Sequence, residues 1–135
     1  MKIIIAGVGK MGSTLTRHLS AEGYDLTLID KNIRVLEENQ EKYDVMVVQG
    51  NCASMEVLSQ AGVAEADLLI AMTGADEINL LCCMTAHGMN PKIHTISRIR
   101  TPEYADQVYK LGDMFGLSLA VNPEKQAALE IERLL

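Results

Sequence analysis

Aromatic residues are scarce in this 135-residue sequence, which has no tryptophan, one phenylalanine and four tyrosines. Hydrophobic residues nevertheless make up 48% of the chain, so the core must consist of aliphatic side chains and some of the eight methionines. A chain of this length can form one domain with a real core. We find no internal linker and no low-complexity segment that would divide it.

Positive charge is also scarce, because 12 Lys and Arg residues stand against 18 Asp and Glu residues, for a formal net charge of −6. This balance argues against nucleic acid and against anionic lipid surfaces as partners. No apolar run approaches the length of a membrane span, and the first residues lack the basic-then-apolar pattern of a secretory signal. These patterns predict a cytoplasmic protein.

Cysteine is limited to three residues, an odd number, and the adjacent Cys82 and Cys83 are poorly placed to pair with each other. We therefore expect reduced thiols in a reducing compartment, with Cys82 and Cys83 as small core side chains. The three histidines have no Cys or carboxylate neighbours at the spacing of metal ligands. The sequence thus predicts neither a metal site nor a catalytic group.

The first 30 residues contain the most informative pattern. An apolar run at residues 2–6 leads directly into Gly7-Val8-Gly9-Lys10-Met11-Gly12, a helical pattern follows, and a second apolar run at 26–29 ends at Asp30. Strand, G-x-G-x-x-G, helix, strand and acid occur here in the order of a dinucleotide-binding βαβ unit.

Each part of this pattern has a physical reason. Gly7 allows a tight turn out of the strand, Gly9 lets a phosphate approach the backbone, and Gly12 lets the helix lie close to the sheet. The N-terminus of that helix presents free N–H groups and a positive dipole end to the phosphate. Asp30 can accept hydrogen bonds from both ribose hydroxyls, which favours NAD(H) or an adenine nucleotide (ATP, ADP or AMP) over NADP.

Short apolar runs alternate with helical patterns along the whole chain. The runs predict strands at 2–6, 25–29, 45–48, 68–72, 93–97 and 119–121, and the periodic stretches predict helices at 11–21, 33–41, 54–61, 76–87 and 102–111. Several runs are apolar throughout, as in a parallel sheet covered on both faces. Left-handed caps are expected at the glycines just past helical stretches, namely Gly23, Gly62, Gly88 and Gly112. The predicted fold is α/β, a Rossmann-like doubly wound parallel six-stranded sheet in a single domain.

Further candidate ligand contacts follow the later strands, because ligands of such sheets bind at the carboxyl ends of the strands. Asn51 can face a base edge, Cys52 offers a small soft surface, and Ser54 is expected to cap the next helix. Glu77 is either a ligand contact or a favourable charge at a helix N-terminus, and Arg98 either holds a diphosphate or forms a surface salt bridge. Arg100 is expected to be solvated. The candidate cofactor-binding residues are Gly7, Val8, Gly9, Lys10, Met11, Gly12, Asp30, Lys31, Asn51, Cys52, Thr73, Gly74, Glu77 and Arg98.

The C-terminal segment carries an apolar stripe at helical spacing, made of Ala127, Ala128, Ile131, Leu134 and Leu135. Either this helix packs on its own sheet, or it crosses to a partner or leads into a further domain. We favour the second interpretation, because the stripe runs to the last residue without a cap. Together with the Met- and Cys-rich segment 80–86, it predicts a self-complementary dimer interface.

The sequence resembles the N-terminal nucleotide-binding domain of TrkA-type potassium-uptake regulators, also called RCK or KTN domains. The resemblance rests on residues 7–12, Asp30, the loop 50–54, the Ala-Asp-x-x-Ile-Ala-x-Thr-x-x-Asp-Glu-x-Asn pattern at 66–79, and Ser97-Arg98-Ile99-Arg100-Thr101-Pro102-Glu103-Tyr104. Val121-Asn122-Pro123-Glu124 is similar to the family's crossover segment. Asn51 stands where Asp is common in the family, so the resemblance says less about how adenine is recognised.

This resemblance implies a regulatory module that binds NAD(H) or adenine nucleotides without converting them, and so not an enzyme. It also implies that residues 1–135 form the RCK N-terminal domain, with 123–135 as a crossover and dimerisation helix, and that the family's C-terminal domain is absent. The expected partners are a second copy, a larger ring in a full-length protein, and a membrane potassium transporter or channel at the inner face of the cell membrane. The alternatives are the NAD-binding domain of a dehydrogenase, although no Tyr-x-x-x-Lys is present, and a scaffold protein, which the intact glycine loop disfavours.

Overall fold

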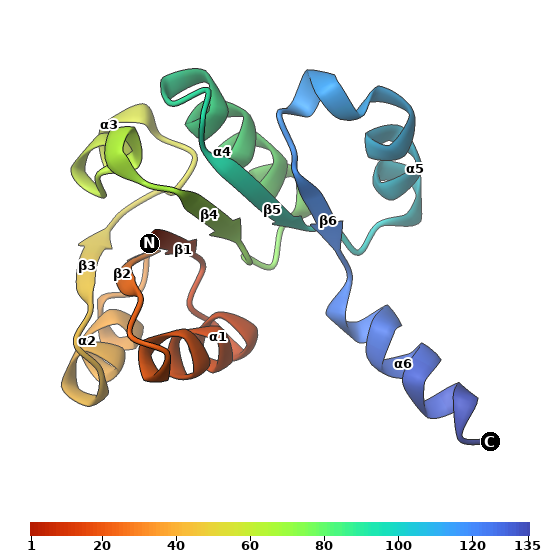
Figure 1. Ribbon diagram of the computed structural model, residues 1–135, viewed down its shortest axis with the longest axis horizontal. Helices are drawn as coiled ribbons and strands as arrows, with labels where there is room; N and C mark the ends of the chain where they lie inside the picture. Colours follow the sequence, from red (N-terminus) through yellow and green to blue (C-terminus); the bar gives the residue numbers. More distant parts are fainter.

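Six strands form one all-parallel sheet in the order β3-β2-β1-β4-β5-β6 in the computed structural model, which describes residues 1–135 (Figure 1). The chain order reverses between β1 and β4, so a crevice is expected where their carboxyl ends diverge. The predicted fold class is confirmed. The strands are β1 (Lys2–Ala6), β2 (Asp25–Asp30), β3 (Met46–Gln49), β4 (Leu68–Ala71), β5 (His94–Arg98) and β6 (Leu119–Val121).

Helices connect the strands and cover both faces of the sheet. In Figure 1, α1 and α2 lie on one side of the sheet, and α3 and α4 lie on the other. The short 3₁₀ helices η1 (Val63–Glu65) and η2 (Gly112–Phe115) follow α3 and α5. The six α-helices are α1 (Lys10–Ala21), α2 (Ile33–Lys42), α3 (Met55–Gln60), α4 (Asp76–Met89), α5 (Pro102–Leu111) and α6 (Pro123–Arg133).

Two apolar clusters form the core, one on each face of the sheet. Ile3 and Ile5 of β1 point into the cluster under α1 and α2, and Ile4 points into the cluster under α3 and α4. Cys82 and Cys83 of α4 are fully buried in the second cluster as free thiols, which confirms their predicted role as core side chains. Burial raises the pKa of Cys83 to about 12, so this thiol stays protonated at neutral pH.

Two of the four predicted glycine caps are wrong. Gly23 and Gly62 have the expected left-handed backbone, with φ of 83° and 82°. Gly88 does not, because α4 continues to Met89 and keeps this glycine inside the helix. Gly112 has φ of −37° at the junction of α5 and η2, and the left-handed residue is Gly116, which ends η2.

Helix α6 does not pack on its own sheet. It has no buried residue and projects away from the sheet (Figure 1), with Ile131 and Leu134 exposed to 61% and 88%. The interpretation that this C-terminal helix packs on its own sheet is therefore wrong for a single chain. The expected exposure of segment 80–86 is also partly wrong: Cys82 and Cys83 face the core, and only Leu81 and Met84 are well exposed.

The glycine loop depends on a very close approach between α1 and β1. A Cβ atom on Gly12 would lie 2.1 Å from the backbone oxygen of Gly7, which a side chain cannot relieve by rotating. We expect Gly12→Ala to lower the free energy of unfolding by about 1–3 kcal/mol in urea titrations, because α1 must shift away from the sheet. Gly88→Ala is the matched control, since a Cβ there meets nothing within 4 Å, and it should stabilise α4 by about 0.5–1 kcal/mol. A Gly12→Ala variant as stable as the wild type would contradict this account.

Candidate functional site

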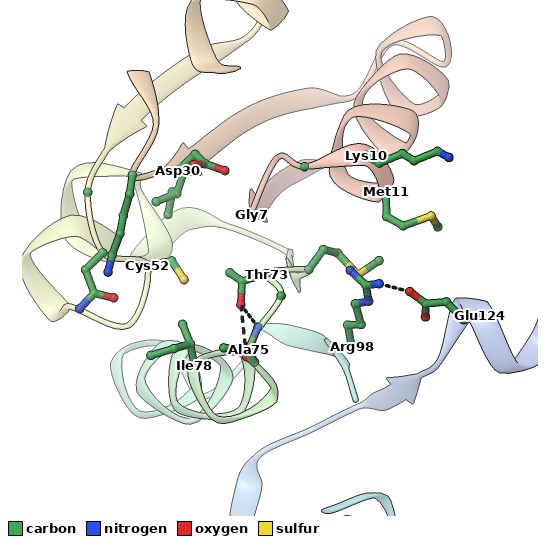
Figure 2. A pocket seen from close by; sticks show the side chains of 17 residues that line it. Gly7, Lys10, Met11, Asp30, Cys52, Thr73, Ala75, Ile78, Arg98 and Glu124 are labelled. Carbon is green, nitrogen blue, oxygen red and sulfur yellow. Dashed lines mark hydrogen bonds and ion pairs between the residues drawn. The ribbon is translucent and has the colours of Figure 1, made fainter. Parts of the chain in front are cut away.

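A cavity of about 840 Å³ opens at the carboxyl ends of the central strands (Figure 2). It lies at the point where the strand order reverses, as the doubly wound topology predicts. The loops after β1, β2, β3 and β4 supply most of its walls, and Arg98 and Glu124 close one side. Its lining residues are Gly7, Gly9, Lys10, Met11, Ile29, Asp30, Lys31, Gly50, Asn51, Cys52, Met72, Thr73, Gly74, Ala75, Ile78, Arg98 and Glu124.

Most of the predicted contact residues line this cavity, but Val8, Gly12 and Glu77 do not. Val8 is buried in the core, and Gly12 lies against the backbone of Gly7. Glu77 is on the exposed side of the first turn of α4, where it accepts a hydrogen bond of 3.3 Å from the hydroxyl of Tyr104. The negative charge of Glu77 raises the pKa of Tyr104. Of the two roles considered for Glu77, its position fits the helix N-terminus.

Asp30 connects the end of β2 to the glycine loop. Its Oδ2 accepts the backbone N–H of Val8 at 2.8 Å, and its Oδ1 accepts the backbone N–H of Asn32 at 2.9 Å. Each carboxylate oxygen has a second acceptor position. Asp30 can therefore hold the glycine loop in place and still receive a hydroxyl group from the cavity.

The loop after β3 forms the wall beside Asp30. The Oδ1 of Asn51 accepts the backbone N–H of Ala53 at 3.0 Å, which leaves its amide N–H₂ free to donate. Ser54 caps α3 as predicted, by accepting the N–H of Val57. Cys52 is 5% exposed, and a hydrogen bond with Cys82 lowers its pKa. This wall therefore offers an amide donor and a small soft surface.

Asn79 fixes the opposite wall and was not among the candidate site residues. Its buried side chain accepts the backbone N–H of Thr73 at 2.9 Å and donates to the backbone oxygen of Arg98 at 3.0 Å. It also accepts the Thr73 hydroxyl at 2.7 Å. The one sequence signal for this role is its place at the end of the Asp-Glu-x-Asn pattern.

Asp76 ties the start of α4 to the loop after β5. Its carboxylate accepts the backbone N–H groups of Arg100 at 3.1 Å and Thr101 at 2.7 Å. Burial raises the pKa of Asp76, but the hydrogen bonds from Thr101 and Arg100 outweigh burial and hold the pKa below its ordinary value. Arg100 is exposed, as expected, and its guanidinium also donates to the backbone oxygen of Gly74 at 2.7 Å.

Arg98 has both of the features that the sequence left as alternatives. It lines the cavity, and its Nη2 forms an ion pair with the carboxylate of Glu124 in the first turn of α6 (Figure 2). The Arg98 side chain is only 12% exposed, against 52% for Glu124. The backbone N–H of Glu124 and the guanidinium of Arg98 hold the pKa of this carboxyl below its ordinary value. Sequence reasoning missed Glu124 because it lies one strand and two helical segments beyond Arg98.

No group of three or more His, Cys, Asp or Glu side chains in the structure is arranged to hold a metal ion. None of its helices combines the length and apolar character needed to cross a membrane. The cavity is lined by backbone groups, by the basic side chains of Lys10, Lys31 and Arg98, and by the carboxylates of Asp30 and Glu124. Such a set suits a ligand with phosphates and ribose hydroxyls.

Comparison with known proteins gives the family. Residues 3–123 match the model of the TrkA-N domain. The chain belongs to the TrkA-N domain family. Over 137 residues it is 40% identical to the Trk system potassium uptake protein TrkA of Haemophilus influenzae, covering 100% of this chain and 30% of that protein. The domain thus spans about 30% of the length of this relative.

Two solved structures closely resemble the structure of this chain. The TrkA-N domain of the inner membrane protein ybaL from Escherichia coli superposes with a TM-score of 0.87 at 26% identity, covering 99% of this chain and 96% of that one. The Kef CTD of Shewanella denitrificans in its AMP-bound form gives a TM-score of 0.82 at 27% identity, with 97% and 77% covered. The resemblance inferred from the sequence motifs is confirmed.

The Asp76 contacts predict a pH-dependent stability. At neutral pH, Asp76→Asn should lower the free energy of unfolding by about 1.5–3 kcal/mol, because the charged acceptor for two backbone N–H groups is lost. The folded pKa is lowered, so this stabilisation is full above the unfolded value of about 3.9 and is lost as the pH falls through the folded value. Urea unfolding from about pH 7 to about pH 3 should therefore show the variant and the wild type converging. The exposed neighbour supplies the control, Glu77→Gln, and a difference that is independent of pH would contradict the charge argument.

Proposed function

We propose that this TrkA-N domain binds NAD(H) or an adenine nucleotide and acts as a regulatory part of a potassium uptake system. The observation that carries the proposal is the cavity at the reversal point of the sheet, which combines the glycine loop, the Asp30 carboxylate and Arg98. The glycine loop and Arg98 suit the phosphates of a nucleotide, and the Asp30 carboxylate suits its ribose hydroxyls.

The residues suggest how such a ligand lies. A Cβ on Gly9 would meet nothing within 4 Å, so the backbone is open to a phosphate at the start of α1. Lys10 and Arg98 supply positive charge on the same side, and Asp30 receives the ribose. The base then faces Asn51 and Cys52. The AMP-bound relative with 27% identity supports an adenine nucleotide in this type of domain.

The link to potassium transport rests on the relatives. The Haemophilus influenzae protein is named as a potassium uptake protein. All of this domain matches part of that protein, at 40% identity. We infer that the domain works at the cytoplasmic face of the membrane, beside an integral-membrane transporter or channel subunit. Binding without chemical conversion of the nucleotide is part of this proposal.

Calorimetry tests the ligand. NADH, ATP and ADP should bind, and NADPH should bind at least about tenfold more weakly than NADH, because the Asp30 carboxylate repels a 2′-phosphate. Asp30→Asn should reduce the difference in affinity between NADH and NADPH. The nucleotides should be recovered unchanged after hours with the protein, with no hydride exchange and no hydrolysis. Tighter binding of NADPH would overturn the argument that Asp30 selects a free 2′-hydroxyl, and turnover would favour the dehydrogenase alternative.

We further propose that α6 mediates self-association, as a crossover and dimerisation helix of residues 123–135. Its apolar side chains are exposed in the single chain, and exposed apolar surface of this kind is typical of an interface. A two-fold axis would bury the same surface from both copies. Within a longer protein, such dimers would build a larger ring against the membrane subunit.

Sedimentation at micromolar concentration should show a dimer. Ile131→Asp or Leu134→Asp should shift it towards monomer by placing a charge in the apolar interface, at a cost of several kcal/mol unless the charge is paired. The matched control is Met55→Asp on α3, where a methionine is exposed to 63%, similar to the 61% of Ile131. A wild-type monomer, or equal effects of the α3 and α6 variants, would contradict the interface.

A further inference from the structure

One ion pair connects the cavity to α6. Among the hydrogen bonds and ion pairs of the structure, the contact of Glu124 with Arg98 is the one that joins residues of α6 to another strand or helix. The other polar contacts of this helix are local, such as the cap from Asn122 to Lys125 and the pair of Arg133 with Glu130. No residue of α6 is buried, so apolar packing does not fix the helix on the sheet.

Arg98 is not fully satisfied by Glu124. The carboxylate contacts Nη2, while the Nε atom of Arg98 is buried and has no hydrogen-bond partner. An unpaired buried donor is costly, and it is rare in folded proteins. A phosphate has three oxygens and can accept from Nη2 and Nε together, in the bidentate arrangement that a guanidinium favours.

Arg98 and Glu124 both line the cavity, so a phosphate that reaches this guanidinium arrives where the carboxylate now lies (Figure 2). Two anions close together on one cation repel each other. Glu124 is half-exposed and can turn to solvent at little cost, whereas Arg98 is held in the rim. The Glu124 carboxylate is therefore the group that moves away from Arg98 when a phosphate binds.

We propose that Glu124 is an internal competitor of the ligand: a phosphate that binds Arg98 displaces Glu124 and releases the first turn of α6 from the cavity rim. This inference rests on the proposed nucleotide site and assigns its regulatory contact. By linkage, the ligand loosens α6 by the same factor by which the Glu124 contact weakens ligand binding. The pair thus couples occupancy of the cavity to the position of the exposed apolar helix.

Calorimetry on the whole domain tests the exchange, with ADP as the charged probe and adenosine as the probe without phosphate. EDTA is present throughout, so that no divalent cation bridges a phosphate and a carboxylate. Glu124→Gln should tighten ADP binding roughly two- to fivefold, the range expected for a partly exposed ion pair, and should leave adenosine binding unchanged. The matched control is Glu130→Gln, which removes one negative charge from the same helix at a residue that pairs only with Arg133.

Hydrogen exchange of residues 122–133 gives the second readout. In the wild type, ADP should raise exchange in the first turn of α6. In the Glu124→Gln variant, exchange in the first turn of α6 should already be raised without ligand, and ADP should not raise it further.

The outcomes separate the two proposals. Failure of ADP, ATP and NADH to bind the wild type would overturn the nucleotide site and the exchange with it. Normal ADP binding that Glu124→Gln leaves unchanged or weakens would overturn the exchange alone. Slower exchange of α6 in the presence of ADP would also overturn it, because the ligand would then fix the helix.

Discussion

Burial of both faces of β1 is the constraint on which the rest of the structure depends. The strand lies between β2 and β4 at the centre of the sheet, and Ile3, Ile4 and Ile5 are at most 1% exposed. Layers of helices are needed on both sides to exclude water from such a strand. Because β1 is also where the chain order reverses, Gly7 and the loop after it open into the cavity.

Buried and half-buried polar groups then fix the rim of that cavity. Asp30 holds the glycine loop, Asn79 connects the loop after β4 to the end of β5, and Asp76 connects α4 to the loop after β5. These contacts join segments that are 19 or more residues apart, except where Asn79 meets its own loop. They hold the walls of the cavity together, and a site that is already ordered lowers the cost of binding a ligand.

Helix α6 is held differently from the rest of the domain. The other helices bury side chains against the sheet, whereas α6 meets it through the ion pair of Glu124 with Arg98. An ion pair with one half-exposed partner contributes little to stability and responds readily to a competing charge. The same arrangement that leaves the apolar side chains of α6 exposed also places its first turn at the rim of the cavity.

The sequence by itself determined the six-stranded parallel fold, the glycine loop and the place of Asp30 at the end of β2 beside that loop, because these depend on local periodicity and on spacing within one βαβ unit. It did not determine where α4 ends, since the helix continues through Gly88 to Met89, which packs against the core. Nor did it decide between a ligand contact and a salt bridge for Arg98. Only the tertiary structure brings Glu124 and Asn79 to this residue, because their meeting depends on how β4, β5 and β6 align and not on any spacing along the chain.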